Sequence, residues 1–233
     1  MATSTLPPSI QARRTTIAMK LVMAVSGSLF VLFVIAHMYG NLKMFGGQAA
    51  YDDYAHHLRT LGEPIAPYSG VLWIIRVVLL GSVLAHIYSA FYLWSRAQGA
   101  RTTKYRMKKA AAATISARFM RWGGVALLLF LIWHILQFTT RTINVNGSHD
   151  SPYDNYVAAF QPSVWWVFVI YALAMVALAM HIRHGVWSAT QTLGWTGNVR
   201  ARRRANTLAI TLAAVVSIGF ILPAVFVLFG VIK

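Results

Sequence analysis

The sequence contains no cysteine, and only 11% of its 233 residues are charged. Soluble domains usually have about a quarter of their residues charged, so this chain has roughly half the usual share. Without cysteine, the chain cannot form disulfides, thiolate-held zinc sites, cysteine-ligated iron–sulfur clusters or a c-type haem attachment. Any metal that it binds must therefore be held by its eight histidines or its few carboxylates.

Acidic residues are also scarce, because five Asp and Glu stand against 21 Lys and Arg, a formal net charge of +16. Such an excess of positive charge is found both in nucleic-acid-binding proteins and in chains that lie against membranes. The apolar share of 58% and the long uncharged runs favour the membrane. We therefore expect the lipid bilayer, and no nucleic acid, as a partner of the chain.

Five apolar segments are long enough to cross a bilayer, which requires about 20 residues. The sequence predicts an all-α membrane protein, a single domain over residues 1–233. A cleavable signal peptide is a poorer interpretation of the first segment, because the apolar run is long and no small-residue cleavage site follows it. The predicted spans cover approximately residues 17–40, 68–95, 117–141, 163–189 and 207–230.

The charged residues divide between the two sides of these spans. The segment before the first span and the connections after the second and fourth contain most of the Lys and Arg and no acid. The positive-inside rule therefore predicts a cytoplasmic N-terminus and an external C-terminus. The connections after the first and third spans contain all the acids, which are Asp52, Asp53, Glu63, Asp150 and Asp154.

The connections are too short for a soluble domain. Within the outer connection 41–67, residues 51–61 are predicted to form a short amphipathic helix, which Gly62 and two prolines end. The outer connection 142–162 is rich in Asn, Gly, Ser, Asp and Pro and is predicted to be irregular. The inner connection 96–116 is basic and contains an alanine run, a composition compatible with a helix on the membrane surface.

Four of the five spans contain a histidine, although ionisable residues inside a membrane are rare and usually functional. A rise of about 1.5 Å per residue puts His37 and His134 near the outer surface and His86 and His181 in the inner half. Two imidazoles at one depth can provide both axial ligands of a haem iron. A single such histidine could equally make a helix–helix hydrogen bond, but matched pairs at two depths predict two b haems.

Other residues are assigned around these pairs. Ser26 and Gly123 lie about three helical turns inward of the outer histidines, so they are expected beside the inner haem. Arg76, in the outer half of the second span, is expected to pair with propionates of the outer haem or to line a polar cavity. The remaining histidines of the outer connections are expected to be solvated; they are His56, His57 and His149.

Four motifs accompany this pattern: KLVMAVSG at 20–27, HMYGN at 37–41, RWGG at 121–124 and HGVWSATQTLG at 184–194. With the five spans and four histidines, they resemble the dihaem cytochrome b membrane subunits of succinate dehydrogenases and fumarate reductases. The resemblance covers essentially the whole chain. It implies a bacterial cytoplasmic membrane, with a flavoprotein and an iron–sulfur subunit on the inner face. Electrons from succinate would pass to the inner haem, the outer haem and then a quinone, often menaquinone.

The resemblance also assigns ligands. The two pairs inferred from depth match the inner and outer haem ligands of the family. One position is ambiguous, because members usually place the ligand four residues before a glycine, which selects His181 relative to Gly185. Some members have the histidine directly before that glycine, which would select His184. We favour His181.

Family members studied for fumarate reduction have a quinone near the outer haem, beside a glutamate of the first outer connection. Glu63 is the only glutamate of this chain and lies in that connection, so it is the candidate for proton exchange with the quinone. The alternative is a solvated loop residue. Some members also carry a glutamate in the fourth span that passes protons. This chain has no acid in that span, so such a path is not expected here.

The sequence thus predicts a haem-b membrane anchor of a succinate:quinone oxidoreductase, with no catalytic residue for succinate itself. One alternative is the dihaem cytochrome b of another quinone-linked enzyme, such as a nitrate reductase, formate dehydrogenase or hydrogenase. An alternative of another class is a haem-free transporter or structural anchor whose histidines line a proton path.

Overall fold

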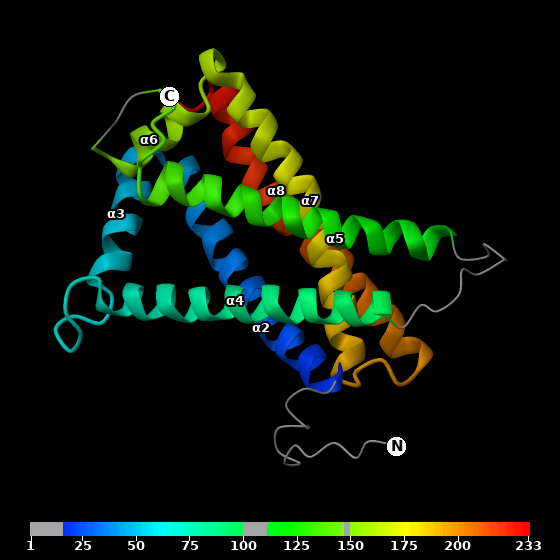
Figure 1. The fold of residues 1–233 in the computed structure, drawn as a ribbon. Coiled ribbons are helices and arrows are strands. Elements are labelled where there is room, and N and C mark those ends of the chain that lie inside the picture. The colour runs from blue at the N-terminus through cyan, green and yellow to red at the C-terminus, as the bar shows by residue number, and fades with distance from the viewer. Residues whose placement is uncertain (1–15, 100–110, 147–149) are drawn as a thin grey trace, which may run out of the picture.

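The computed structural model describes residues 16–99, 111–146 and 150–233, and for residues 111–119 the backbone alone. All regular structure in these residues is helical (Figure 1). Five helices are long and apolar enough to cross a membrane, which confirms the predicted fold class. They are α2 (Thr16–Leu42), α4 (Gly70–Gly99), α5 (Ala111–His134), α7 (Trp165–Thr192) and α8 (Val199–Leu228).

Three of the long helices, α2, α7 and α8, pack against one another and form the core of the bundle. Small side chains allow the close approach of α8, because Ala209 and Ala213 are buried one turn apart and Gly219 lies directly against Met38 of α2. Helix α4 is added mainly on α2, and α5 is added on α7. In Figure 1, α4 and α5 run across the direction of the core helices.

The boundaries differ from the predicted spans at both basic connections. Helix α8 begins at Val199, eight residues before the predicted span, and the Asn198 side chain caps it by accepting a hydrogen bond from the Ala201 N–H at 2.8 Å. The prediction counted apolar residues only, whereas the helix continues through a run of arginines. Long arginine side chains can bury their stems and keep the charge in the interface, so the charges do not end the helix.

The outer connections are more ordered than predicted. The predicted helix 51–61 is observed as α3 (Gly47–Thr60), which follows a 3₁₀ turn, η1 (Lys43–Gly46). The prediction that 142–162 is irregular was wrong, because this connection contains α6 (Pro152–Ala159) and a second 3₁₀ turn, η3 (Pro162–Val164). Ser151 caps α6 by accepting a hydrogen bond from the Asp154 N–H at 3.2 Å, and proline occupies the first helical position.

We call η1, α3 and α6 the outer cap, and the end of the bundle that they cover the outer end. Asp52 of α3 joins them, because its carboxylate accepts hydrogen bonds from the Ser151 hydroxyl at 2.7 Å and from the Tyr153 N–H at 3.0 Å. Tyr153 in turn donates to the carbonyl of the C-terminal residue Lys233 at 3.0 Å. Burial raises the pKa of the neighbouring Tyr156 well above its usual value, so that side chain stays neutral.

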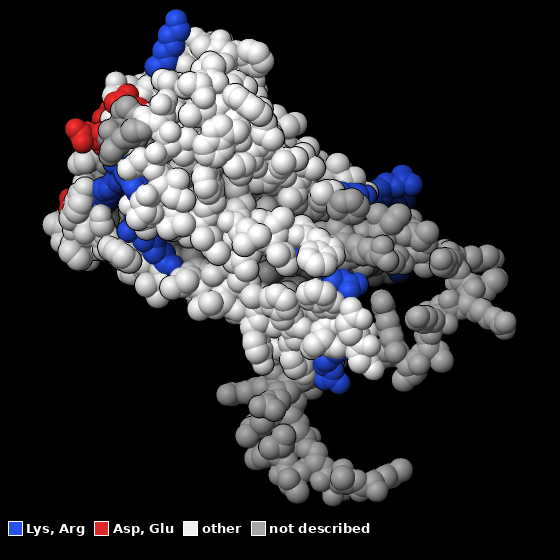
Figure 2. Space-filling view, turned by 45° about the horizontal axis from the view of Figure 1, so that its top comes forward, with Lys and Arg blue, Asp and Glu red and all other residues white. Residues whose placement is uncertain are grey.

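The charged side chains separate along the molecule. In Figure 2, the visible Asp and Glu gather at the outer end together with some Lys and Arg, and a broad surface without charged residues lies between this end and the Lys and Arg at the opposite end. This distribution is the one on which the predicted orientation depends, and the orientation itself stays a prediction. His149 lies outside the described residues, as do residues 100–110 of the inner connection.

The absence of cysteine allows a direct test of orientation. We expect a single cysteine in place of Ser163, at the outer end, to react with a membrane-impermeant maleimide added to right-side-out vesicles. A single cysteine in place of Gly197, between α7 and α8, should react only after the vesicles are opened. The reverse pattern would contradict the predicted orientation.

Replacing Asp52 by Ala should destabilise the purified protein, because the Ser151 hydroxyl and the Tyr153 N–H would lose their acceptor. We expect a loss of about 1–3 kcal/mol, measured as a lower melting temperature in detergent. The matched control is Asp53→Ala, since Asp53 is the adjacent acid and is exposed. Equal melting temperatures for the two variants would show that Asp52 does not hold the outer cap.

Candidate functional site

The first candidate site lies near the outer end, where His37 of α2 faces His134, the last residue of α5. Their ring centroids are 5.8 Å apart and their planes cross at 78°. Phe33 stacks on His37 at 5.4 Å, and Phe220 of α8 lies 5.5 Å from the same ring. Phe138 lies 5.6 Å from His134. The pair is therefore surrounded by aromatic side chains from several helices.

A chain of hydrogen bonds extends from His134. Its Nδ1 lies 3.2 Å from the Tyr171 hydroxyl of α7. The Tyr171 hydroxyl lies 2.9 Å from Oε1 of Gln137, and the same oxygen accepts a hydrogen bond from Nε1 of Trp133 at 2.9 Å. Gln137 belongs to a single π-helical turn, η2 (Ile135–Thr139), which directly follows His134. Such turns occur frequently at functional sites, because the extra residue redirects side chains.

The second candidate site lies deeper in the bundle, where His86 of α4 faces His181 of α7. Their ring centroids are 6.1 Å apart and their planes cross at 56°. The Ser26 hydroxyl of α2 lies 3.2 Å from Nδ1 of His86. Nδ1 of His181 is buried and has no hydrogen-bond partner in the described part of the chain. His181 is thus held by packing and His86 by a polar contact as well.

Small residues adjoin this deeper pair. Ser26 contacts His86. A Cβ added to the adjacent Gly27 would lie 3.3 Å from the His86 ring, and a Cβ on Gly124 of α5 would meet His181 at 3.7 Å. A Cβ on Gly123 would meet nothing within 4 Å. The expected place of Ser26 and Gly123 beside the inner haem stays a prediction.

The ring that faces His86 belongs to His181, one of the two histidines that the sequence left open. His184 follows three residues later on α7 and is half-buried. The structure thus brings together the four histidines that depth alone had paired. Their roles as ligands stay a prediction.

Both pairs fit the spacing of two axial imidazoles. A metal–imidazole bond is about 2 Å long and a ring centre lies about 1 Å beyond its nitrogen, so two such ligands have centroids about 6 Å apart. The observed 5.8 and 6.1 Å agree with this value. The described residues contain no cluster of three or more His, Cys, Asp or Glu that could hold a metal by themselves. Two imidazoles per level at this spacing fit the two protein ligands that a haem iron takes.

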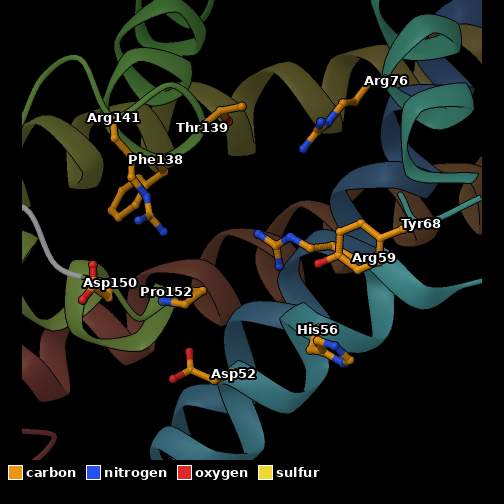
Figure 3. Close-up of a pocket in the computed structure, with 10 residues that line it drawn as sticks. All are labelled: Asp52, His56, Arg59, Tyr68, Arg76, Phe138, Thr139, Arg141, Asp150 and Pro152. Carbon is orange, nitrogen blue, oxygen red and sulfur yellow. The ribbon is translucent and has the colours of Figure 1, made fainter. Parts of the chain in front are cut away.

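A polar pocket of about 550 Å³ opens at the outer end between the outer cap and the long helices. Figure 3 shows the guanidinium groups of Arg59, Arg76 and Arg141 directed into it from α3, α4 and the segment after η2. Arg76 also lies over the Trp73 ring at 4.8 Å. The lining residues are Asp52, His56, Arg59, Tyr68, Arg76, Phe138, Thr139, Arg141, Asp150 and Pro152.

Sequence reasoning placed Arg76 near the outer end but did not find the two other arginines of this pocket. Arg59 and Arg141 lie in the connections, where basic residues carry no signal of their own, and only the folded outer cap brings them to Arg76. His56 and His57 of α3 are both exposed, and His56 is among the residues that line the pocket. An anionic group could be bound by these arginines.

Glu63 lies outside this pocket lining, in the loop between α3 and α4, and its side chain is exposed. Its backbone N–H donates to the Thr60 carbonyl at 3.1 Å, which continues the end of α3 as a turn. The structure therefore puts the candidate quinone glutamate at the outer end, on the same side of the bundle as His37 and His134.

Sequence reasoning also missed Tyr171 and Gln137, because it considered only ionisable residues within the spans. A signal was present. Gln137 is a polar residue in an apolar run, three positions after His134 and four after Trp133, so the three side chains lie on one helical face.

Comparison with protein families identifies the family of the chain. A family model described as succinate dehydrogenase/fumarate reductase transmembrane subunit matches residues 94–221, more than half of the chain. The matched segment includes His134 and His181 and begins near the end of α4, after His37 and His86. Comparisons with curated proteins and with solved structures gave no match. The chain therefore belongs to the family of succinate dehydrogenase/fumarate reductase transmembrane subunits.

Proposed function

We propose that this membrane anchor holds two b haems and conducts electrons between a cytoplasmic dehydrogenase and a quinone. The observation that carries the proposal is the presence of two facing histidine pairs at two depths, with centroids 5.8 and 6.1 Å apart. A proton path or a set of helix–helix hydrogen bonds does not require histidines in pairs at this spacing. Membership of the succinate dehydrogenase/fumarate reductase family favours the same function.

In this proposal His37 and His134 would hold the outer haem, and His86 and His181 the inner haem. The contact between the rings of His86 and His181 supports His181 over His184. When bound, each haem would supply one-electron transfer. The histidines would orient the haems, and the apolar helices would exclude water from them.

The three arginines of the outer pocket supply positive charge near the outer histidine pair, since Phe138 lines this pocket and its ring lies 5.6 Å from that of His134. Arg76 is the proposed propionate partner, and Arg59 and Arg141 share its pocket. Guanidinium groups bind carboxylates by charge-assisted hydrogen bonds, which are about twice as strong as neutral ones. The proposed partner proteins are a flavoprotein and an iron–sulfur subunit on the cytoplasmic face, with succinate oxidised in the flavoprotein.

The proposed electron acceptor is a quinone, and the family resemblance favours menaquinone. Glu63, on the outer end, is proposed to exchange protons with it. A carboxylate can act as a general acid or base when it lies within hydrogen-bond reach of the reacting oxygen.

The family match also separates this function from its alternatives. A dihaem cytochrome of a nitrate reductase, formate dehydrogenase or hydrogenase would share the histidine geometry, but the matched family is that of succinate and fumarate enzymes. Co-purification tests the difference, because a flavoprotein with a cysteine-rich iron–sulfur partner is expected to accompany this chain.

Substitution of the histidines tests the ligand assignment. Reduced-minus-oxidised spectra of the purified protein should show two b-type components. We expect His37→Ala and His134→Ala to remove one component, and His86→Ala and His181→Ala to remove the other, because an iron that loses one axial ligand no longer gives the same spectrum. His184→Ala is the matched control and should retain both. Loss of the same component from His37→Ala and His86→Ala would contradict the pairing, and a chain without haem would exclude the proposed function.

Replacing Glu63 by Gln should slow quinone reduction by at least about tenfold while leaving both haem components intact, because the amide cannot exchange a proton. Quinone-dependent oxidation of the pre-reduced complex measures the rate. Asp53→Asn is the matched control, since it removes another exposed acid of the outer end. An unchanged rate in Glu63→Gln would assign Glu63 to the solvated loop.

A further inference from the structure

The hydrogen bonds around His134 have only one consistent set of directions. Trp133 Nε1 can only donate, so the side-chain atom of Gln137 that it contacts at 2.9 Å must be the amide oxygen. That oxygen can only accept, so the Tyr171 hydroxyl, also 2.9 Å away, must donate to it. Tyr171 has a single hydroxyl hydrogen, so at its 3.2 Å contact with His134 it must accept.

His134 is therefore protonated at Nδ1 and unprotonated at Nε2. The partners that impose this tautomer are buried, since Tyr171 is 9% and Gln137 6% exposed, so water does not offer an alternative set of bonds. A histidine binds a metal through its unprotonated nitrogen, and the hydrogen bond at the other nitrogen fixes which nitrogen that is.

We propose that Tyr171 and Gln137 are positioning residues that set the tautomer of His134 and lower the reduction potential of the outer haem. This inference rests on the proposed function, in which His134 is an axial ligand. A hydrogen bond donated by Nδ1 gives the imidazole more negative character and makes it a more basic ligand. A more basic ligand favours the oxidised iron, so the Tyr171 hydroxyl holds the outer haem at a lower potential than an unbonded histidine would.

The π-helical turn gives this arrangement its geometry. Because η2 begins immediately after His134, Gln137 lies one turn beyond the histidine on the face that meets Tyr171 of α7. The acceptor of the histidine proton thus comes from one helix and the group that orients this acceptor comes from another. The two are held by the contact between α5 and α7.

The inner pair has a different environment. The Ser26 hydroxyl that contacts His86 also lies 2.7 Å from the Val22 carbonyl of its own helix, and Nδ1 of His181 has no partner in the described residues. Because a carbonyl can only accept, the Ser26 hydroxyl donates to Val22 and accepts from Nδ1 of His86, so the acceptor at the inner pair is Ser26 and not Tyr171. Tyr171 is therefore expected to act on the outer haem alone.

The test is Tyr171→Phe in the full-length chain purified with its haems, with redox titration of both components and their EPR signals as readouts. The outer component is identified as the one that His37→Ala removes. We expect the ratio of reduced to oxidised outer haem at a fixed ambient potential to rise about threefold to tenfold, which corresponds to the loss of one hydrogen bond. The inner component should titrate as in the unmodified protein. Gln137→Leu should shift the outer component in the same direction by less, because Tyr171 can still accept.

Tyr156→Phe is the matched control, since Tyr156 is a buried tyrosine in the same aromatic cluster at the outer end. An unchanged potential of the outer haem in Tyr171→Phe, with two haems present, would overturn the inference and leave the proposed function intact. An equal shift in Tyr156→Phe would also overturn it, because the effect would then come from general disturbance of the cluster. Absence of haem from the unmodified chain would instead overturn the proposed function, and the inference with it.

Discussion

The membrane interior offers no water to polar groups, and this constraint organises the molecule. Backbone groups in the five long helices are satisfied within each helix, and polar side chains must find partners inside the bundle. Histidines on four helices consequently meet in two pairs rather than facing lipid. The polar side chains beside His134 are satisfied in the same way. The Gln137 oxygen accepts hydrogen bonds from Trp133 and Tyr171, and the Tyr171 hydroxyl also contacts His134. The candidate sites are thus the places where polar groups are concentrated in an otherwise apolar bundle.

The outer end combines this buried polarity with a charged surface. Asp52 holds α3 to α6, and the folding of the two outer connections brings Arg59 and Arg141 to the pocket that Arg76 enters from α4. The acid and the bases therefore have distinct tasks, since the carboxylate organises the connections and the guanidinium groups remain directed into the pocket (Figure 3). The cap also lies close to the outer histidine pair, so the same element that closes the bundle shapes the surroundings of that pair.

Much of this architecture could be predicted from the sequence because the membrane makes strong demands on composition. The five spans followed from the apolar runs, and the pairing of the histidines followed from their depths. The cap helix α6 was missed because the connection that contains it is rich in Asn, Gly, Ser, Asp and Pro, a composition typical of loops, although Ser151-Pro152 is a helix-start signal. Gln137 was missed because only ionisable residues were considered within the spans, although its spacing from Trp133 and His134 places the three on one helical face. The gathering of three arginines depends on tertiary folding of two connections and has no local signal.

The division of the bundle into a core and two added helices has a consequence for assembly. Each histidine pair joins one core helix to one added helix: His37 of α2 with His134 of α5, and His181 of α7 with His86 of α4. A haem bound at either level would act as a cross-link between them, and its binding energy would contribute directly to the stability of the fold. Cofactor insertion would then be the step that completes the tertiary structure, with α4 and α5 secured separately. Loss of one haem would loosen one peripheral helix and leave the other in place.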